Sequence, residues 1–330
     1  MNIVYTLNNK FIPQVAASIT SVCENNQNAK NIDFYLLHTD ITSENQKKLK
    51  KFIHKYGSKI HFIKLDNISK YFNFEFDTNG WNPIVLARLL LDKLLPDRLE
   101  KVLYLDGDTI VRGNLQELWG TDLSKNVIAA SIEPTVDKKR KNQLGLSNSP
   151  YYNAGVLLIN LEKWRKNHTG EKIIKYYKKN SGQLFANDQD AINGSQKGKI
   201  LTLSPRYNYY NIFDQYPYTF LSKLCDYPYI SYATYKEAKK NPTIIHYLGE
   251  ERPWRIGNKH KYKNDYLKYL NLTPWKNQGL ESGWGLYFIC WNLFNIITKP
   301  FPRLRYNIIN ALIPTFMKRR SKNLIKNKEK

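Results

Sequence analysis

Two aspartates separated by a single glycine, Asp106 and Asp108, follow a short apolar run in the stretch KVLYLDGDTIV. The run, Val102 to Leu105, predicts a strand buried on both faces, because continuous apolar sequence bounded by charge is typical of a covered sheet. Side chains alternate along a strand, so both carboxylates are expected on the same side of its C-terminal end. Hard cations prefer carboxylate oxygens, and a metal held by one or two carboxylates keeps positions open for phosphate. The pair therefore indicates a divalent metal site that binds a diphosphate.

Two other interpretations of this motif remain open from these residues alone. D-x-D is a common pattern, and Asp106 can simply cap a solvated turn after the strand. An apolar strand followed by D-x-D is also the nucleophile motif of haloacid-dehalogenase phosphatases. That motif has Thr or Val two residues after the second aspartate, a place that Ile110 occupies here.

The sequence around the motif predicts an α/β fold. Strand-like runs alternate with helical patterns: NIVYT at 2–6, IDFYLLH at 32–38, KIHFIKL at 59–65, and a helix at 83–96 before the aspartates. This order implies a mostly parallel sheet with helices on both faces. Ligands bind such sheets at the carboxyl ends of the strands, where the two aspartates lie. Beyond about residue 200 the pattern weakens, until TIIHYLG at 243–249 predicts one more short strand.

Local signals place the helices between these strands. Val15, Ile19 and Val22 recur at helical spacing and form the inner face of the first helix. Ser43 and Gln46 form a capping box that starts the second helix. The third, at 83–96, has a proline in its first turn, where the missing N–H costs nothing.

Composition and charge narrow the class of protein. The chain has 330 residues, of which 42% are hydrophobic, and this suits a globular fold. A net charge of +23 indicates a polyanionic partner: nucleic acid, an anionic membrane surface or a phosphorylated small molecule. Residues 299–330 hold ten Lys and Arg residues against Glu329 alone, so nine of the 23 net charges lie in this tail. A nucleic-acid-binding protein is the alternative class. Because the charge concentrates in a tail without a nucleic-acid motif, we expect no nucleic acid partner.

The cysteines Cys23, Cys225 and Cys290 are odd in number and far apart, so neither a disulfide framework nor a zinc knuckle is expected. The first residues, MNIVYTLNN, lack the basic and apolar regions of a secretory signal. We expect a cytosolic location.

Three further motifs follow the aspartates: YYNAGVLLINLEKW at 151–164, NDQDAING at 187–194 and HYLGEERPW at 246–254. With IVYTLNN and VLYLDGD, in this order and spacing, they resemble glycosyltransferase family 8. This family comprises retaining nucleotide-sugar transferases, among them bacterial lipopolysaccharide α-galactosyltransferases and glucosyltransferases, and glycogenin. The resemblance covers roughly residues 1–260.

The resemblance implies a GT-A fold, which is a Rossmann-like, mixed and mostly parallel sheet flanked by helices. We expect the catalytic domain at residues 1–264 and a small helical, aromatic and basic extension at 265–330. The resemblance also implies a UDP-sugar donor, UDP-galactose or UDP-glucose, and usually Mn²⁺, with Mg²⁺ as the alternative.

By the same resemblance, Asp106, Asp108 and His246 are the metal ligands, and Gly107 lies in the donor site between the aspartates. The chemistry agrees, since Mn²⁺ accepts carboxylate and imidazole together. His246 also ends a short apolar strand.

Three matched residues are expected near the donor's charged groups. Gly249 and Arg252 match positions beside the diphosphate, where glycine lets the backbone approach and a cation offsets phosphate charge. Relatives often have lysine where Arg252 stands. Arg88 matches an arginine that reaches the donor.

Thr6, Asn8 and Phe11 match the residues that hold the uridine, with Phe11 as a stacking surface for the base. Asn8 replaces an aspartate that accepts from the uracil N–H in some relatives. An amide oxygen can accept the same hydrogen bond.

Asn153, Asp188 and Gln189 match residues that hold the donor sugar, and Asp190 is a neighbouring carboxylate. The implied reaction transfers a hexose to an acceptor hydroxyl with retention at the anomeric carbon. Retaining glycosidases use a carboxylate nucleophile, but the matching position here is Gln189, a poor nucleophile. We therefore favour front-face attack with the Gln189 amide oxygen next to the anomeric carbon, and Asp190 stays open as a nucleophile.

The acceptor is expected to be a glycan or a glycosylated protein. A nucleotidyltransferase with the same metal pair is a further alternative, which would release pyrophosphate rather than UDP.

The segment GWGLYFICWNLFNIITK, at 283–299, is apolar over about fourteen residues. This is too short to cross a bilayer, which takes about 20 residues. With its aromatic residues and the basic tail it fits an interfacial membrane anchor on the cytoplasmic face, or equally a helical cap on the catalytic domain. Because the matched donor residues lie before Trp254, we expect deletion from about residue 283 to leave UDP binding nearly intact.

Overall fold

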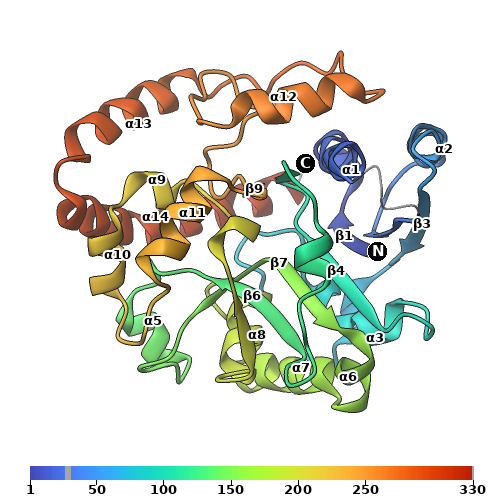
Figure 1. The fold of residues 1–330 in the computed structure, drawn as a ribbon, viewed down its shortest axis with the longest axis horizontal. Coiled ribbons are helices and arrows are strands. Elements are labelled where there is room, and N and C mark those ends of the chain that lie inside the picture. The colour runs from blue at the N-terminus through green and yellow to red at the C-terminus, as the bar shows by residue number, and fades with distance from the viewer. Residues whose placement is uncertain (27–30, 329–330) are drawn as a thin grey trace.

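A seven-stranded sheet with helices on both faces forms the centre of the protein (Figure 1). This computed structural model describes residues 1–26 and 31–328. The strand order is β3-β2-β1-β4-β7-β6-β8. The strands are β1 (Asn2–Leu7), β2 (Asp33–His38), β3 (Lys59–Lys64), β4 (Lys101–Leu105), β6 (Ile128–Ile132), β7 (Tyr152–Asn160) and β8 (Ile200–Leu203).

Strand direction in this sheet is mixed. β3, β2, β1 and β4 run parallel to one another, and β6 runs parallel to β8. β7 is antiparallel to both β4 and β6. The predicted fold class, a mixed and mostly parallel sheet flanked by helices, is confirmed.

Alternate residues of each strand face opposite helical layers. In β1, Ile3 and Tyr5 pack in the cluster of α1 (Ile12–Asn25) and α2 (Ser43–His54), whereas Val4 faces the other layer. That second layer contains η3 (Pro83–Leu90), a 3₁₀ helix, with α6 (Leu161–Lys166), α7 (Thr169–Lys179) and α8 (Asn187–Ser195). Figure 1 shows α1 and α2 on one side of the sheet and α6 and α7 on the other.

The start of α2 differs from the sequence prediction by one residue. Thr42, not Ser43, is the N-cap, and its hydroxyl accepts from the Asn45 N–H at 3.3 Å. Gln46 donates its side-chain amide to the Ile41 carbonyl at 3.0 Å. The predicted capping box is wrong because Ser43 already has helical geometry as the first residue of α2.

The helix predicted at residues 83–96 is mostly a 3₁₀ helix. η3 ends at Leu90, and the short α3 (Leu91–Leu94) follows it. Asn82 caps η3, and Pro83 occupies its first turn as predicted. Six of the eight η3 residues are buried, so tertiary packing and not helix propensity sets this local geometry.

A second, two-stranded sheet joins β5 (Thr109–Val111) to β9 (Ile244–His246). The two strands run antiparallel, with Thr109 opposite His246. The strand predicted at TIIHYLG is therefore confirmed, but it pairs beside the D-x-D turn and not in the main sheet.

Smaller helices connect these elements. They are η1 (Asn9–Phe11), η2 (Ile68–Tyr71), α4 (Gln116–Trp119), α5 (Lys138–Gln143), η4 (Pro205–Tyr207), α9 (Ile212–Gln215), α10 (Tyr218–Leu224) and α11 (Tyr232–Lys240).

The C-terminal part consists of α12 (Lys263–Leu272), α13 (Gly285–Thr298) and α14 (Pro302–Lys328). The predicted domain boundary at residue 264 falls inside α12, where Tyr269 accepts a hydrogen bond from Asn25 of α1 at 2.7 Å. The division into two domains stays a prediction. Within residues 1–26 and 31–328, no helix is long and apolar enough to cross a membrane.

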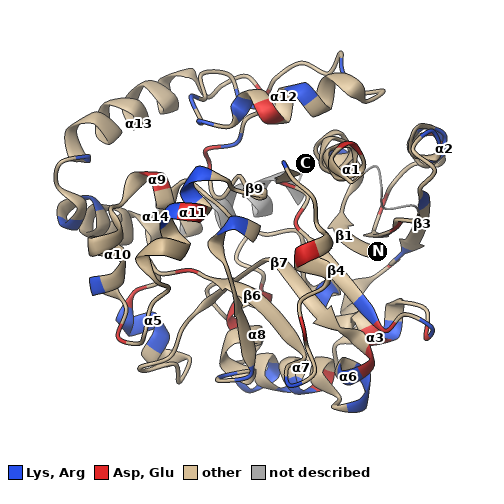
Figure 2. Ribbon diagram, in the orientation of Figure 1, with Lys and Arg blue, Asp and Glu red and all other residues tan. Residues whose placement is uncertain are grey.

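Positive charge is spread over the outer elements and is not confined to the tail. Figure 2 shows Lys and Arg on α2, α5, α6 and α7 as well as near the C-terminal helices. Glu329 and Lys330, which belong to the basic tail, lie outside the described residues.

Candidate active site

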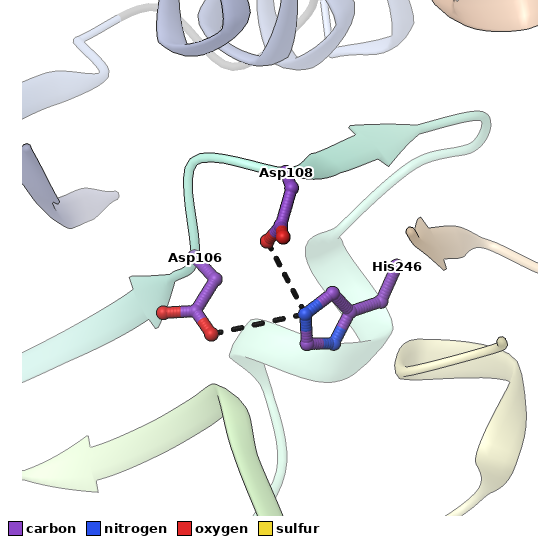
Figure 3. Close-up of side chains that lie close together, drawn as sticks. All are labelled: Asp106, Asp108 and His246. Carbon is purple, nitrogen blue, oxygen red and sulfur yellow. Dashed lines mark ion pairs between the residues drawn. The ribbon is translucent and has the colours of Figure 1, made fainter. Parts of the chain in front are cut away.

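Asp106, Asp108 and His246 come together at the C-terminal edge of β4 (Figure 3). Asp106 directly follows β4, Asp108 directly precedes β5, and His246 is the last residue of β9. The His246 Nε2 lies 3.7 Å from Asp106 Oδ2 and 3.3 Å from Asp108 Oδ1. One ligand atom from each residue lies within 4.8 Å of the others, so the three side chains can converge on one cation.

The hydrogen bonds behind His246 fix which ring nitrogen faces the aspartates. The Gly155 N–H donates to Asn153 Oδ1 at 2.9 Å, which sets the orientation of that amide. Asn208 Nδ2 also donates to Asn153 Oδ1 at 2.9 Å, so Asn208 Oδ1 points the other way, 2.9 Å from His246 Nδ1. Nδ1 must therefore donate its hydrogen, and neutral His246 turns an Nε2 lone pair toward two carboxylates. This donor set fits a divalent metal, since a ligand histidine usually donates its other N–H to a neighbouring acceptor.

Two glycines leave room for this arrangement. A Cβ on Gly155 would lie 2.1 Å from His246 Cε1 and 2.9 Å from Asp106 Oδ2, so a larger residue would displace the site. A Cβ on Gly107, in the D-x-D turn, would lie 2.7 Å from a Val15 methyl carbon. Both positions therefore require glycine for close approach.

Charge pairing shifts the titration of these ligands. Burial alone would lower the pKa of His246, but the carboxylates of Asp108 and Asp106 raise it. Burial would raise the pKa of Asp108, but His246 and Arg252 lower it below its ordinary value. The site thus stabilises positive charge next to the two carboxylates.

Arg88 links the metal-ligand candidates to the predicted sugar-binding residues. It is buried in η3, and its Nη2 donates to Asp106 Oδ1 at 2.8 Å. Its Nε lies 2.8 Å from Asp188 Oδ2, and its Nη1 donates to the Ala154 carbonyl at 2.7 Å. Burial raises the pKa of Asp188 to about 6, with Arg88 opposing the shift. The arginine predicted to reach the donor is therefore held between two carboxylates.

Thr6 joins the same network through Tyr104. The Thr6 hydroxyl lies 2.8 Å from the Tyr104 hydroxyl, which donates to Asp106 Oδ1 at 2.9 Å. The Tyr104 ring lies under the Arg88 guanidinium, 4.3 Å from its carbon. Sequence alone did not single out Tyr104, although its spacing of two residues from Asp106 along the strand was a signal for it.

Asn8 and Phe11 flank the turn after β1. Asn8 caps η1, and its Oδ1 accepts from the Phe11 N–H at 3.2 Å. The Phe11 ring meets Trp254 edge to face at 5.6 Å, and the Arg252 guanidinium lies 5.8 Å from the Phe11 ring centre. The structure thus brings Phe11 and Arg252, predicted for base and diphosphate, to the same place.

Arg252 and Gly249 lie in the loop after β9. Arg252 Nη2 is 3.5 Å from Asp108 Oδ2, and its Nε donates to the Gly249 carbonyl at 3.0 Å. Gly249 has a φ of +70°, in the left-handed region that favours glycine. The loop therefore places a cation beside the aspartate pair.

Asn153 and Gln189 both contact Glu133, at the end of β6. Asn153 Nδ2 and Gln189 Nε2 donate to Glu133 Oε2 at 2.9 and 3.2 Å. The Ala154 N–H donates to Gln189 Oε1 at 2.8 Å, so a backbone group fixes the orientation of this amide. Gln189 therefore uses one lone pair of its carbonyl oxygen and keeps the second.

Asp190 is fully engaged in the protein. Its Oδ1 accepts from Arg140 Nη2 and from the Tyr151 hydroxyl, both at 2.6 Å. Its Oδ2 accepts from the Ala186 N–H at 2.9 Å. Asp190 is 1% exposed, so its carboxylate is bound by a cation, a tyrosine hydroxyl and a backbone N–H, and not by solvent.

Besides Tyr104, sequence reasoning missed three polar residues of this site: Asn208, Glu133 and Arg140. Asn208 follows η4, Glu133 follows β6, and Arg140 lies in α5. None belongs to a motif with a fixed spacing from the aspartates. The Glu133 position, directly after a strand, was the one signal available.

The mixed sheet, with an aspartate pair and a histidine at this edge, matches a glycosyltransferase of the GT-A type. The sequence model of glycosyl transferase family 8 matches residues 2–256, and the chain belongs to this family. General stress protein A of Bacillus subtilis is 25% identical over 286 residues, which cover 84% of this chain and 96% of that protein. The lipopolysaccharide 1,2-glucosyltransferase of Escherichia coli K12 is 26% identical over 84% of this chain and 79% of its own.

Solved structures agree with this assignment. The galactosyltransferase LgtC, in complex with donor and acceptor sugar analogues, matches with a TM-score of 0.70 and 26% identity. The match covers 86% of this chain and 99% of that one. The predicted family and GT-A fold are confirmed, and so is the enzyme class, a family 8 UDP-sugar-dependent hexosyltransferase. The phosphatase interpretation of the D-x-D motif is wrong.

Proposed function

We propose that this enzyme transfers galactose or glucose from its UDP-sugar to a hydroxyl of a glycan or glycoprotein acceptor, with retention at the anomeric carbon. The observation that carries the proposal is the convergence of Asp106, Asp108 and the Nε2 lone pair of His246. A neutral imidazole whose Nε2 lone pair faces two carboxylates is unfavourable, and either a proton on Nε2 or a bound cation removes the repulsion.

Asp106, Asp108 and His246 would hold Mn²⁺, with Mg²⁺ as the alternative. Carboxylate and imidazole ligands together suit Mn²⁺. When bound, the metal neutralises the charge that develops on the leaving diphosphate.

Residues at both ends of the site would hold the nucleotide. Arg252 lies 3.5 Å from Asp108 Oδ2, close enough to pair with a diphosphate that reaches the aspartates. Phe11 offers a ring to the base, and Thr6 and Asn8 lie at the end of β1 beside it. The Gly249 backbone allows the diphosphate to approach without a Cβ in the way.

Arg88, Asp188, Asn153 and Gln189 would orient the sugar. In the reaction the bond from the anomeric carbon to the diphosphate oxygen breaks, and a bond from the acceptor oxygen to that carbon forms. The acceptor proton passes to the leaving phosphate oxygen. The remaining lone pair of the Gln189 carbonyl oxygen would face the positive anomeric carbon.

We assign Asp190 to positioning in this mechanism. Both of its oxygens accept hydrogen bonds, and Arg140 pairs with it. A carboxylate held in this way is a weak nucleophile, because attack would break all of these bonds. Front-face attack beside Gln189 is therefore favoured over a covalent intermediate on Asp190.

We also propose that the enzyme is cytoplasmic and binds the inner face of the membrane peripherally. α13 exposes large apolar side chains at helical spacing, with Leu286 at 75% and Ile289 at 67% exposure. Lys299 and Arg303, the first cations of the basic tail, follow α13. An apolar stripe with neighbouring positive charge suits an anionic lipid surface. A relative of this chain is a lipopolysaccharide glucosyltransferase, and this supports a membrane-bound glycan as the acceptor.

The test is a panel of UDP-sugars, each scored for slow hydrolysis without acceptor, with Mn²⁺, with Mg²⁺ and with excess chelator. We expect UDP release from UDP-galactose or UDP-glucose in Mn²⁺ and none in chelator. In a parallel assay with UTP and a sugar 1-phosphate, release of pyrophosphate would instead favour a nucleotidyltransferase. Full activity in chelator would overturn the metal assignment.

A further inference from the structure

We propose that Arg255 is a positioning residue for the donor diphosphate, and that Glu281 and Trp284 of the C-terminal part hold it in place. We call these three residues the clasp. The inference rests on the proposed function, because it needs the diphosphate to bind beside Arg252. The loop from Gly249 to Arg255 follows the metal-ligand candidate His246.

The loop is built from local contacts and has no regular secondary structure of its own between β9 and α12. The Arg252 N–H donates to the Glu250 carbonyl at 2.8 Å, and the Arg255 N–H donates to the Arg252 carbonyl at 3.2 Å. Gly249 begins the loop in the left-handed conformation. Such short turns do not by themselves fix the direction of a long side chain such as Arg252.

Arg255 makes three kinds of contact, one within the loop and two with a distant segment. Its Nη1 donates to the Glu250 carbonyl at 3.0 Å and also contacts the Glu250 carboxylate. Its Nε donates to Glu281 Oε2 at 3.1 Å. Its guanidinium carbon lies 3.5 Å from the centre of the Trp284 ring. Charge-assisted hydrogen bonds and a stacked aromatic ring together suit arginine and not lysine.

The backbone strengthens the same connection. Glu281 N–H donates to the Trp254 carbonyl at 2.8 Å, and Ile256 N–H donates to the Glu281 carbonyl at 2.9 Å. Arg255 and Glu281 thus face each other in an isolated parallel bridge. The segment at Glu281 therefore acts as a short edge that pairs with the end of the loop.

The far side of the clasp is anchored by α13. Trp284 is the N-cap residue of α13, and Phe288, one turn later, is buried at 1% exposure. The loop is consequently held by β9 at one end and by the clasp at the other. Between these two anchors Arg252 reaches Asp108 and the rings of Phe11 and Trp254.

This geometry changes the expectation for the C-terminal part. From sequence alone, deletion from about residue 283 was expected to leave UDP binding nearly intact. Deletion there removes Trp284 and Phe288, and with them the stacking partner of Arg255. We now expect the deletion to weaken UDP binding.

The test compares UDP with UMP, because the loop would contact the diphosphate. Affinities are measured by calorimetry in Mn²⁺ for the full chain and for Glu281→Gln, Trp284→Ala and Arg255→Lys. We expect UDP affinity to fall about tenfold relative to UMP affinity in each variant, with a similar rise in donor KM and less than a twofold change in kcat. Trp284→Phe, which keeps an aromatic face, should retain most of the wild-type ratio of UDP to UMP affinity.

Two matched controls separate the clasp from general destabilisation. Trp275→Ala removes a ring that stacks with Lys48, and Asp265→Asn removes a carboxylate that pairs with Arg112. Trp275 lies beside Lys48 and Asp265 pairs with Arg112, and neither is paired with Arg252, Arg255 or Glu281 among the described residues. The ratio of UDP to UMP affinity should therefore not change. Thermal unfolding of every variant checks the fold. If Trp284→Ala unfolds, Glu281→Gln still tests the clasp, because it keeps the shape of the side chain.

Each outcome decides a different point. An unchanged affinity ratio in folded Glu281→Gln and Trp284→Ala would overturn the clasp and leave the proposed function standing. Equal loss of UDP and UMP binding would make the three residues structural only, and would also overturn the inference. Absence of UDP binding by the wild-type chain would overturn both the proposed function and the clasp.

Discussion

The edge of the main sheet and the C-terminal helices place their side chains in opposite ways. At the sheet edge, charged groups are buried and paired: Arg88 lies between Asp106 and Asp188 with its guanidinium donating to both the protein backbone and a carboxylate. On α13, large apolar side chains such as Leu286 and Ile289 are exposed. Asp106 and Asp108 gather negative charge that a cation would offset, and α13 leaves apolar surface exposed to solvent. We propose that each region serves a ligand, and that the two ligands differ in kind.

The two regions would recognise their ligands through different kinds of contact. The sheet edge has a fixed set of polar atoms, with amide orientations set by the Ala154 and Gly155 N–H groups, and this suits one small charged ligand. The exposed face of α13 presents apolar side chains such as Leu286 and Ile289 instead, and would suit a broad surface such as a lipid headgroup layer. The clasp at Arg255 lies between them.

The largest expected effect is that of Asp108→Asn. The substitution keeps the shape of the side chain but removes a charge from the metal site, so we expect transfer to fall by about 10³-fold or more. Steady-state UDP release in Mn²⁺ measures this, and circular dichroism checks the fold. Asp122→Asn, at an exposed aspartate that pairs with Ser124, is the control and should be fully active. Activity of Asp108→Asn near that of the wild type would remove the aspartate pair from the mechanism.

The next effect concerns stability at the sheet edge. Arg88→Met leaves the carboxylates of Asp106 and Asp188 without their shared cation, and breaking a buried pair in this way costs about 3–5 kcal/mol. Arg112→Met, which breaks the half-exposed pair with Asp265, should cost about 1 kcal/mol or less. Urea unfolding of the two variants measures both costs. Equal losses of unfolding free energy in the two variants would show that the buried Arg88 pairs are worth no more than the half-exposed Arg112 pair.

A third effect depends on pH. Because Asp108 and Asp106 raise the pKa of His246 in the metal-free protein, Mn²⁺ must displace a proton from Nε2. Mn²⁺ affinity should then rise about tenfold per pH unit below the folded pKa of His246 and level off above it. Calorimetry in buffers of different ionisation enthalpy should detect about one proton released per metal at pH values below that pKa.

The same shift has a consequence for stability. The folded pKa lies above that of the unfolded chain, so the proton on His246 stabilises the metal-free fold fully below the unfolded pKa. This contribution is lost as the pH rises through the folded pKa, and His246→Gln should lack it. An affinity for Mn²⁺ that does not depend on pH would argue against His246 as a ligand.

The smallest expected effect concerns membrane binding. Ile289→Asp should weaken association with anionic vesicles about tenfold, because it removes an apolar contact and adds a repelled charge. Leu272→Asp, at an exposed leucine of α12, is the control and should bind as the wild type does. Co-sedimentation at low and high salt measures both. If the wild-type protein ignores anionic vesicles, α13 does not bind lipid, and the comparison between the two regions loses its second ligand.

The sequence allowed much of the first region to be predicted. The apolar run before Asp106, the strand at His246 and the glycines rest on local patterns, and local patterns fix strands and turns. The predicted capping residue of α2 was wrong, because the N-cap depends on one hydrogen bond. The helix at 83–96 was predicted but its 3₁₀ geometry was not, because that geometry depends on burial of residues such as Leu86 and Leu89.

The remainder depends on tertiary contacts that sequence spacing does not show. Asn208 forms a hydrogen bond with His246, 38 residues away in the sequence, and Glu281 accepts one from Arg255, 26 residues away. Arg140 reaches Asp190 from an element 50 residues earlier. No periodicity connects such positions, so their roles came only from the packed structure.

Anomalous diffraction from crystals grown with Mn²⁺ and UDP tests the central claim most directly, because it locates the metal independently of activity. We expect a manganese peak between Asp106, Asp108 and His246 Nε2, with the UDP diphosphate on its open side and Arg252 beside it. A peak at another place, or UDP bound away from these side chains, would contradict the account.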